Sequence, residues 1–245
     1  MDIREDSIAD PAQVQQGAKE ISRMVQAKKN GYSWKSGRPY NPRGRGEEQE
    51  AFREEGIKQS ANGIRRRVRI LFCDEMRYGL ISNHRRGWSK RGKQRPLIPY
   101  GMDYEFGYIY IGIDIESWQL ESLLLPDADS LTTKVFIDYL REEYGNEEVI
   151  VIWDGAGFHR SWEVKGIEGV RFVRLPAYSP ELNPVERLIE ELRKSTANKV
   201  FNNLGEVEEV LIEALKEYIH NREKVESLCG FSWIKKQMEE IRLTS

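Results

Sequence analysis

The hydrophobic residues of this chain form short, separated runs, and their spacing predicts alternating strands and helices. Five runs between residues 65 and 175 have the length and the β-branched or aromatic content of strands. The second and third should pair antiparallel across a turn at Glu116 and Ser117. The expected strands are Val68–Phe72, Gly107–Ile115, Trp118–Leu125, Val149–Trp153 and Val170–Leu175.

Helices are expected where apolar residues recur three or four positions apart. Ser130 can cap the helix that follows the third strand. Residues expected to face inward on that helix are Leu131, Val135, Phe136, Tyr139 and Leu140. The other expected helices are 11–28, 184–197, 206–219 and 231–241. Three strands, a helix, a strand, a short helical link, a strand and a helix fit a mixed α/β sheet.

Length and composition bound the class of protein. A chain of 245 residues allows one large domain, or one domain with an appendage. No apolar run approaches the roughly 20 residues that a membrane-spanning helix needs, so no membrane partner is expected. The acidic N-terminus does not resemble a signal peptide. Cys73 and Cys229 are too few for a disulfide framework or a zinc site, and a cytoplasmic protein is expected.

The net charge of −2 conceals a segregation of basic residues. Residues 27–46 hold six Lys or Arg and no acid, and residues 65–95 hold eleven against only Asp74 and Glu75. Such segments suit the phosphate backbone of nucleic acid, although an ordinary solvated face is the alternative. Trp88, within the second segment, could stack on a base or simply anchor a β-turn.

Three acids stand where strands end or a helix begins. Asp74 and Asp154 each follow an apolar run, and Glu186 lies in the first turn of the helix expected at 184–197. Together they suggest a carboxylate cluster for divalent metal. Each acid also has a simpler explanation. Asp74 could pair with Arg77, Asp154 could cap a short helix, and Glu186 could form a capping box with Asn183.

Three segments around these acids resemble the catalytic motifs of the DDE transposases, most closely the mariner-like superfamily and its bacterial insertion-sequence relatives. The resemblance covers about residues 65–225, and the segment 31–52 resembles the basic linker that precedes the catalytic domain. The motifs are Cys73-Asp74-Glu75, Trp153-Asp154-Gly155-Ala156-Gly157-Phe158-His159 and Tyr178-Ser179-Pro180 with Asn183-Pro184-Val185-Glu186.

The resemblance implies an RNase H-like fold, a retroviral-integrase-like mixed sheet flanked by helices. In that fold the first and fourth strands are neighbours, which would place Asp74 beside Asp154. It also implies that Asp74, Asp154 and Glu186 hold two Mg²⁺ or Mn²⁺ ions. Glu190 and Glu181 are alternatives for the third ligand. The chain departs from the family at Gly155, where asparagine is usual, and in a shorter interval between Asp154 and Glu186.

The activity implied is cleavage of double-stranded DNA at transposon ends, followed by attack of the freed 3′-hydroxyl on TA-containing target DNA. A homodimer on the DNA and a nucleoid-associated location are expected with it. His159 could contact phosphate or merely close the loop after Asp154. The residues expected to contact DNA are Arg85, Arg86, Lys90, Arg91, Lys93 and His159.

Four segments describe the expected organisation. Residues 1–30 would hold a helix, a remnant of a helix-turn-helix module, and 31–64 a basic linker or arm. Residues 65–225 would form the catalytic domain and 226–245 a helical tail. Because about 25 residues precede the linker-like segment, a separate chain could supply end recognition. The alternatives are a domesticated or truncated, catalytically silent DNA-binding remnant, and a structure-specific nuclease without strand transfer.

Overall fold

A five-stranded mixed sheet forms the centre of the structure. The computed structural model describes residues 43–64, 68–86, 97–155 and 167–244, so the helix expected at 11–28 lies outside the described residues. The strand order is β3-β2-β1-β4-β5. The strands are β1 (Val68–Gly79), β2 (Phe106–Asp114), β3 (Leu120–Leu125), β4 (Glu148–Trp153) and β5 (Val170–Arg174).

The first and fourth strands are neighbours, as expected. β1 pairs antiparallel with β2 and parallel with β4, and β4 pairs parallel with β5. The apolar run of β4 is buried from Val149 to Trp153, which is typical of a strand covered on both faces. The RNase H-like mixed sheet predicted from the sequence is therefore confirmed.

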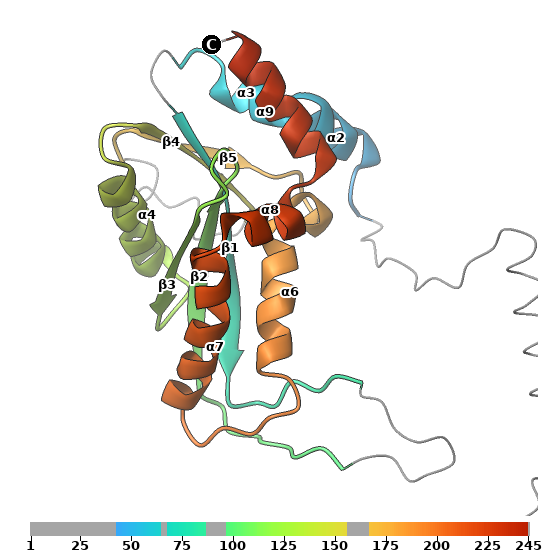
Figure 1. Cartoon of the computed structure of the whole chain (residues 1–245), viewed down its shortest axis with the longest axis vertical. Coiled ribbons are helices and arrows are strands. Elements are labelled where there is room, and N and C mark those ends of the chain that lie inside the picture. The colour runs from blue at the N-terminus through green and yellow to red at the C-terminus, as the bar shows by residue number, and fades with distance from the viewer. Residues whose placement is uncertain (1–42, 65–67, 87–96, 156–166, 245) are drawn as a thin grey trace, which may run out of the picture. The chain divides into compact units, whose positions relative to one another are not determined.

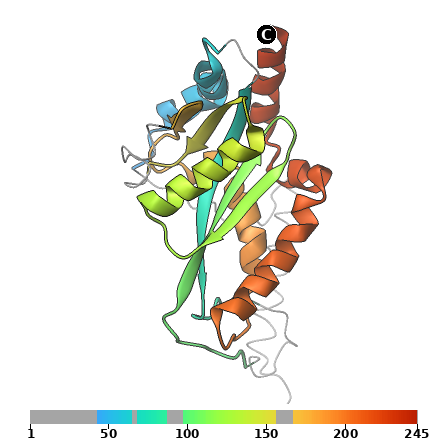
Figure 2. The same cartoon turned by 90° about the vertical axis from the view of Figure 1, so that its left-hand side faces the viewer.

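Helices cover both faces of this sheet (Figures 1 and 2). Helix α4 (Ser130–Tyr144) packs on one face, where it shares a hydrophobic cluster with alternate residues of β1 such as Leu71 and Cys73. Helices α6 (Val185–Ser195), α7 (Leu204–Ile219) and α8 (Arg222–Cys229) cover the other face.

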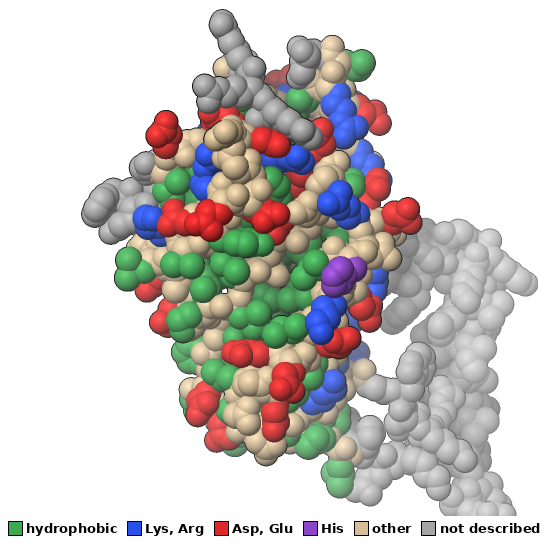
Figure 3. Space-filling view, turned by 60° about the vertical axis from the view of Figure 1, so that its left-hand side comes forward, with side chains coloured by type: hydrophobic (Ala, Val, Ile, Leu, Met, Phe, Trp, Pro, Cys, Tyr) green, Lys and Arg blue, Asp and Glu red, His purple; other side chains and the backbone are tan. Residues whose placement is uncertain are grey.

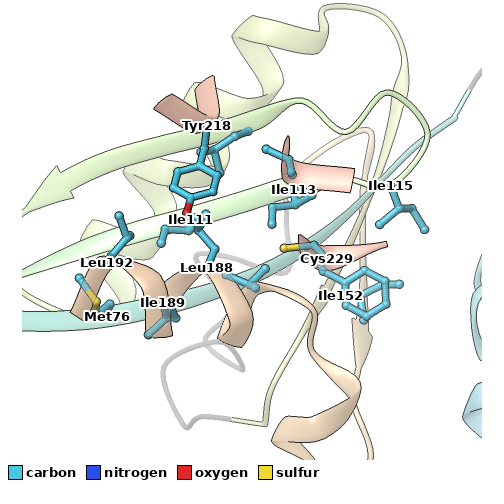
Figure 4. Packing of buried hydrophobic residues seen from close by; sticks show 14 of the residues in the cluster. Met76, Ile111, Ile113, Ile115, Ile152, Leu188, Ile189, Leu192, Tyr218 and Cys229 are labelled. Atoms are coloured by element: carbon cyan, nitrogen blue, oxygen red, sulfur yellow. The ribbon is translucent and has the colours of Figure 1, made fainter. Parts of the chain in front are cut away.

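Figure 4 shows from close by the hydrophobic cluster on this other face of the sheet. In it, α6 residues such as Leu188 and Leu192 pack over Met76 and Ile111 of the sheet. The alternation of buried residues along β1 thus assigns its two faces to two different helical layers.

Strand β1 is longer than the apolar run that predicted it. The expected strand ended at Phe72, but the observed one continues to Gly79, because β2 pairs with it as far as Gly79 and Phe106. Beyond Asp74 and Glu75 the alternation of buried residues resumes with Met76 and Tyr78. Asp74 therefore lies inside a strand rather than at its end.

The start and the buried stripe of α4 also differ from expectation. Asp129, not Ser130, is the N-cap, and it forms a capping box with Thr132. Leu131 and Val135 are exposed, because the stripe that faces the sheet runs through other positions. Those buried positions are Thr133, Phe136, Ile137, Leu140 and Tyr144.

A helix precedes the sheet within the range expected as a basic arm. Residues 46–61 are helical as α2 (Gly46–Ala51), the π-helical turn η1 (Phe52–Gly56) and α3 (Ile57–Ala61). This helix packs against α9 (Ser232–Thr244), the terminal helix expected at 231–241. α8 was not expected from the sequence.

Gln237 of α9 joins these two segments through four backbone groups. Its side-chain oxygen accepts from the amides of Ile57 and Lys58 at 2.9 and 3.2 Å, and its nitrogen donates to the carbonyls of Phe52 and Arg53 at 3.1 and 2.8 Å. A π-turn shifts the helical hydrogen-bond register, so backbone groups there need other partners. Gln237, which is almost fully buried, supplies them.

The face toward α4 and β3 carries a band of hydrophobic side chains with acidic and basic side chains around it (Figure 3). None of the helices in the described segments combines the length and the hydropathy that a bilayer crossing requires.

Candidate metal centre and catalytic pocket

A cavity of about 430 Å³ opens where β4 and β5 end, beside the middle of β1 and the start of α6. Asp74, Asp154 and Glu186 all contribute to its wall, so the structure brings the three acids singled out in the sequence to one cavity. We call it the acidic pocket. Its lining residues are Asp74, Asp154, Gly155, Arg174, Leu175, Pro176, Ala177, Tyr178, Ser179, Pro180, Asn183 and Glu186.

The register of β1 and β4 explains why Asp74 and Asp154 meet. The last pair of the parallel ladder is Phe72 with Ile152. Asp74 and Asp154 each come two residues later, so both lie just beyond this pair. β4 ends at Trp153, whereas β1 continues, and the space left beside β1 is where the acidic pocket opens.

Asn183 fixes the position of Asp74. Its side-chain nitrogen donates to the Asp74 carboxylate at 3.1 Å and to the Cys73 carbonyl at 2.9 Å. Its side-chain oxygen accepts from the Val185 amide at 3.2 Å. The Glu75 amide donates to the other oxygen of Asp74 at 2.9 Å. Asn183 is buried, and it therefore connects the interior of β1 to the first turn of α6.

The capping box considered for Glu186 does not form. Helix α6 begins at Val185 and its N-cap is Pro184, which has no capping side chain; the Asn183 side-chain oxygen accepts from the Val185 amide instead. The backbone N–H of Asn183 donates to the Pro180 carbonyl at 3.0 Å rather than to Glu186, and Glu186 lines the acidic pocket.

The ion pair with Arg77, the simpler explanation for Asp74, is not formed between these two described residues. Arg77, its suggested partner, lies with its guanidinium 5.4 Å from the centre of the Phe106 ring. Glu75 occupies the opposite face of β1, as strand alternation predicts, and accepts from the indole nitrogen of Trp153 at 3.2 Å.

The electrostatics of the acidic pocket favour a bound cation. Burial raises the pKa of Asp74 to about 8, and repulsion from Glu186, Glu75 and Asp154 adds to the shift. Burial also raises the pKa of Glu186, with Arg193 opposing the shift and Asp154 adding to it. Carboxylates that raise one another's pKa are close enough to interact, and a divalent cation would relieve their repulsion.

The donor set of the acidic pocket fits Mg²⁺ or Mn²⁺, which prefer carboxylate oxygen. In the described part of the chain, however, no three His, Cys, Asp or Glu side chains converge into a ready-made ligand cage. The three acids line one cavity without forming such a cage.

The alternative third ligands lie elsewhere. Glu190 forms an ion pair with Arg85 at 3.8 Å, and its side chain is 56% exposed. Glu181 is exposed and does not line the acidic pocket. Of the three candidates, Glu186 is the one that the structure places beside Asp74 and Asp154.

The residues expected to contact DNA are only partly described. Arg85 is tied to its surroundings through its backbone amide, which donates to Asn198 at 2.9 Å, and through Glu190. Arg86 is exposed. The remaining expected DNA contacts lie outside the described residues: Lys90, Arg91, Lys93 and His159. Trp88 lies outside them as well.

Three further residues line the acidic pocket but were not predicted from the sequence to be site residues. Asn183 was assigned to a helix cap, and Arg174 lay within an expected strand. Tyr178 is 51% exposed and has a φ of 57°, a strained left-handed conformation for a tyrosine. The proximity of Asn183 and Tyr178 to Glu186 in the third motif was the one available signal; for Arg174 there was none.

Comparisons with known proteins agree with the fold and the motifs. The family model of the DDE superfamily endonucleases matches residues 69–208. The Mos1 mariner paired-end complex with Mn is similar in structure, with a TM-score of 0.60 and 15% identity over 98% of this chain and 82% of that one. A pre-cleavage Mos1 transpososome has a TM-score of 0.59, 15% identity and the same coverage.

The catalytic domain of Mos1 mariner transposase has a TM-score of 0.50 and 14% identity over 84% of this chain and 98% of that one. Likeness at this level of identity shows a common fold. A search of curated proteins found no significant match. The family model covers more than half of the chain, and it includes all three acids of the acidic pocket. The chain therefore belongs to the DDE superfamily of endonucleases.

Proposed function

We propose that this protein is the catalytic part of a DNA transposase, which cuts DNA at the ends of a mobile element and joins the freed ends to target DNA. The observation that carries the proposal is the presence of Asp74, Asp154 and Glu186 in one cavity of a DDE endonuclease fold. The fold-level likeness to mariner transposase complexes supports it.

In this proposal Asp74, Asp154 and Glu186 hold two divalent ions, Mg²⁺ or Mn²⁺. When bound, such ions activate water or a 3′-hydroxyl and stabilise the oxygen that leaves the phosphate. Asn183 keeps the Asp74 carboxylate oriented through its hydrogen bond, and it couples that acid to the helix that carries Glu186. Groups behind the ligands commonly tune metal affinity in this way.

The proposed partner is double-stranded DNA, both at the ends of the element and in a TA-containing target. Solved Mos1 structures are paired-end and strand-transfer complexes, so we propose a dimer of this chain that holds two ends together. A separate chain could supply end recognition. The protein would act in the cytoplasm on nucleoid DNA.

The first prediction concerns Asp154→Asn, which keeps the shape of the side chain and removes its charge. Strand transfer should be measured with Mg²⁺ or Mn²⁺ on a pre-cleaved element end that carries a free 3′-hydroxyl. Loss of a metal ligand should cost more than the roughly 10- to 100-fold typical of residues behind the ligands. Glu181→Gln is the control, because Glu181 is an exposed acid within the third motif but outside the acidic pocket.

Equal activity of Asp154→Asn and the unchanged protein would refute the metal-dependent mechanism. If neither protein acts while both bind DNA, the catalytically silent remnant is the better description. Cleavage without joining would point to the nuclease. Melting temperatures of all variants show whether a loss of activity comes from unfolding.

A further inference from the structure

Arg174 brings a positive charge to the wall of the acidic pocket. It is the last residue of β5 and pairs in register with Trp153, the last residue of β4. The parallel strands therefore end together, and Arg174 lies close to the segment that carries Asp154 and Gly155. It is exposed and lines the acidic pocket together with the three acids.

The guanidinium of Arg174 occupies the space beside Gly155. A Cβ added at Gly155 would lie 2.2 Å from two guanidinium nitrogens of Arg174 and 2.4 Å from its central carbon. Any side chain at this position would therefore displace the end of Arg174. Gly155 stands where the family resemblance leads one to expect asparagine, and an asparagine would begin with that overlapping Cβ.

Arg171, a neighbour of Arg174 on β5, shows what a structural arginine does in this sheet. Arg171, three residues earlier on β5, donates to the backbone carbonyls of Ser60 and Asn62 at 2.8 and 3.2 Å and so joins β5 to the end of α3. Within the described part of the chain, no carboxylate forms an ion pair with Arg174. Its charge is thus available at the acidic pocket.

We propose that Arg174 binds a phosphate of the DNA strand that enters the acidic pocket, and that Gly155 is the small residue that lets it do so. The inference rests on the proposed function, because it assigns the substrate contact of the same site. A guanidinium presents paired donors that match phosphate oxygens, and it stays charged at every relevant pH. The three acids beside Arg174 would be neutralised by metal ions, so an anionic substrate that arrives with these ions could approach Arg174.

The test combines Arg174→Ala, Arg174→Lys, Gly155→Ala and the double variant Gly155→Ala/Arg174→Ala. The substrate is a pre-cleaved duplex end with Mg²⁺, and kcat, KM and the salt dependence of DNA affinity are measured. Arg174→Ala should lower kcat/KM about 10- to 100-fold, and Arg174→Lys should restore part of it. Loss of one phosphate contact should reduce the slope of log affinity against log salt by about 0.9.

Gly155→Ala moves the guanidinium without removing it, so it should reproduce most of the loss. The double variant should then be no worse than Arg174→Ala, because the two changes remove the same contact. Arg222→Ala is the control for charge removal, since Arg222 donates to Gln119 and does not line the acidic pocket. It should leave all three measurements unchanged.

An unchanged kcat/KM and salt slope in Arg174→Ala, while Asp154→Asn is inactive, would overturn the role of Arg174 and leave the proposed function standing. A lower melting temperature with an unchanged slope would assign Arg174 a structural role and overturn it as well. If even the unchanged protein has no activity, the proposed function fails, and the salt slope alone decides whether Arg174 contacts phosphate.

Discussion

Asp74 lies inside a strand, with Asn183 and the backbone of Glu75 holding its two oxygens. Burial and the nearby acids make its negative charge costly in the metal-free protein, as its pKa of about 8 indicates. The same surroundings would give a divalent ion a strong advantage, because binding a cation removes the repulsion that raises the pKa. The same burial beside other acids therefore makes the Asp74 charge unfavourable without metal and favourable when a metal ion is bound.

The second prediction concerns the pH dependence that follows from Asp74. Its pKa is about 8 in the folded protein against the ordinary value of 3.8, so the bound proton stabilises the fold. This contribution is complete below pH 4 and is lost as the pH rises to 8. Relative to Asp74→Asn, the metal-free protein should lose on the order of a few kcal/mol of unfolding free energy across that range.

Urea unfolding at several pH values, with a chelator present, measures this difference. Added Mn²⁺ should raise the melting temperature of the unchanged protein and have a much smaller effect on Asp74→Asn. A constant difference between the two proteins from pH 4 to 8 would show that Asp74 is ionised throughout, contrary to the prediction.

The sequence predicted the acids better than it predicted their surroundings. Apolar runs and the third motif pointed to Asp74, Asp154 and Glu186, because strand patterns and short motifs are local features. The continuation of β1 past Asp74 was missed because two consecutive acids interrupt its alternation. Asn183 was missed for another reason: it bonds to β1, far away in the sequence, and a helix cap was a sufficient local explanation for it. Arg174 gave no local signal, because it lay within an expected strand.

At the scale of elements, the contact between α9 and the helix of residues 46–61 links two distant parts of the chain. Gln237 bonds to four backbone groups around the π-turn, and the Phe52 and Trp233 rings pack edge to face with centroids 6.0 Å apart. The helix before the sheet reaches the rim of the acidic pocket, since Gln49 donates to the Ser179 hydroxyl at 2.9 Å. It was not expected because its sequence is charged and carries few apolar residues.

The third prediction tests this contact with Gln237→Met, which has a similar size but cannot form hydrogen bonds. Two buried and two part-buried backbone groups would lose this partner, so the unfolding free energy should fall by about 2–5 kcal/mol. Amide exchange should rise in residues 52–58. Glu240→Gln on the same helix is the control: it weakens the part-buried ion pair with Lys58 and leaves the four backbone groups bonded to Gln237, so its effect should be smaller. Equal effects of the two variants would contradict the role given to Gln237.

At the scale of the whole molecule, a net charge of −2 is compatible with DNA binding only if the basic groups are gathered on part of the surface. The face shown in Figure 3 carries both acidic and basic side chains around a hydrophobic band, so neither sign of charge dominates it. We therefore expect DNA to be guided by the basic segment that follows β1, where Lys and Arg far outnumber acids.

The fourth prediction is that DNA binding is electrostatic and largely independent of sequence. Affinity for several unrelated duplexes should fall steeply as salt is raised. Neutralising Arg85, Arg86, Lys90 and Arg91 together should weaken binding to all of them alike. A mobility-shift assay over a range of salt concentrations checks both points. Tight, salt-insensitive binding to one short sequence would instead show that the chain contains a sequence reader.

The position of Gln237 has a consequence for gene copies that carry a premature stop codon. A chain that ended before Ser232 would still encode every acid of the acidic pocket, yet it would lack the side chain that completes the π-turn. The helix that supports the pocket rim through Gln49 would then lose its main support. We expect such copies to be inactive, so an intact set of acids would not be enough to identify a functional element in a genome.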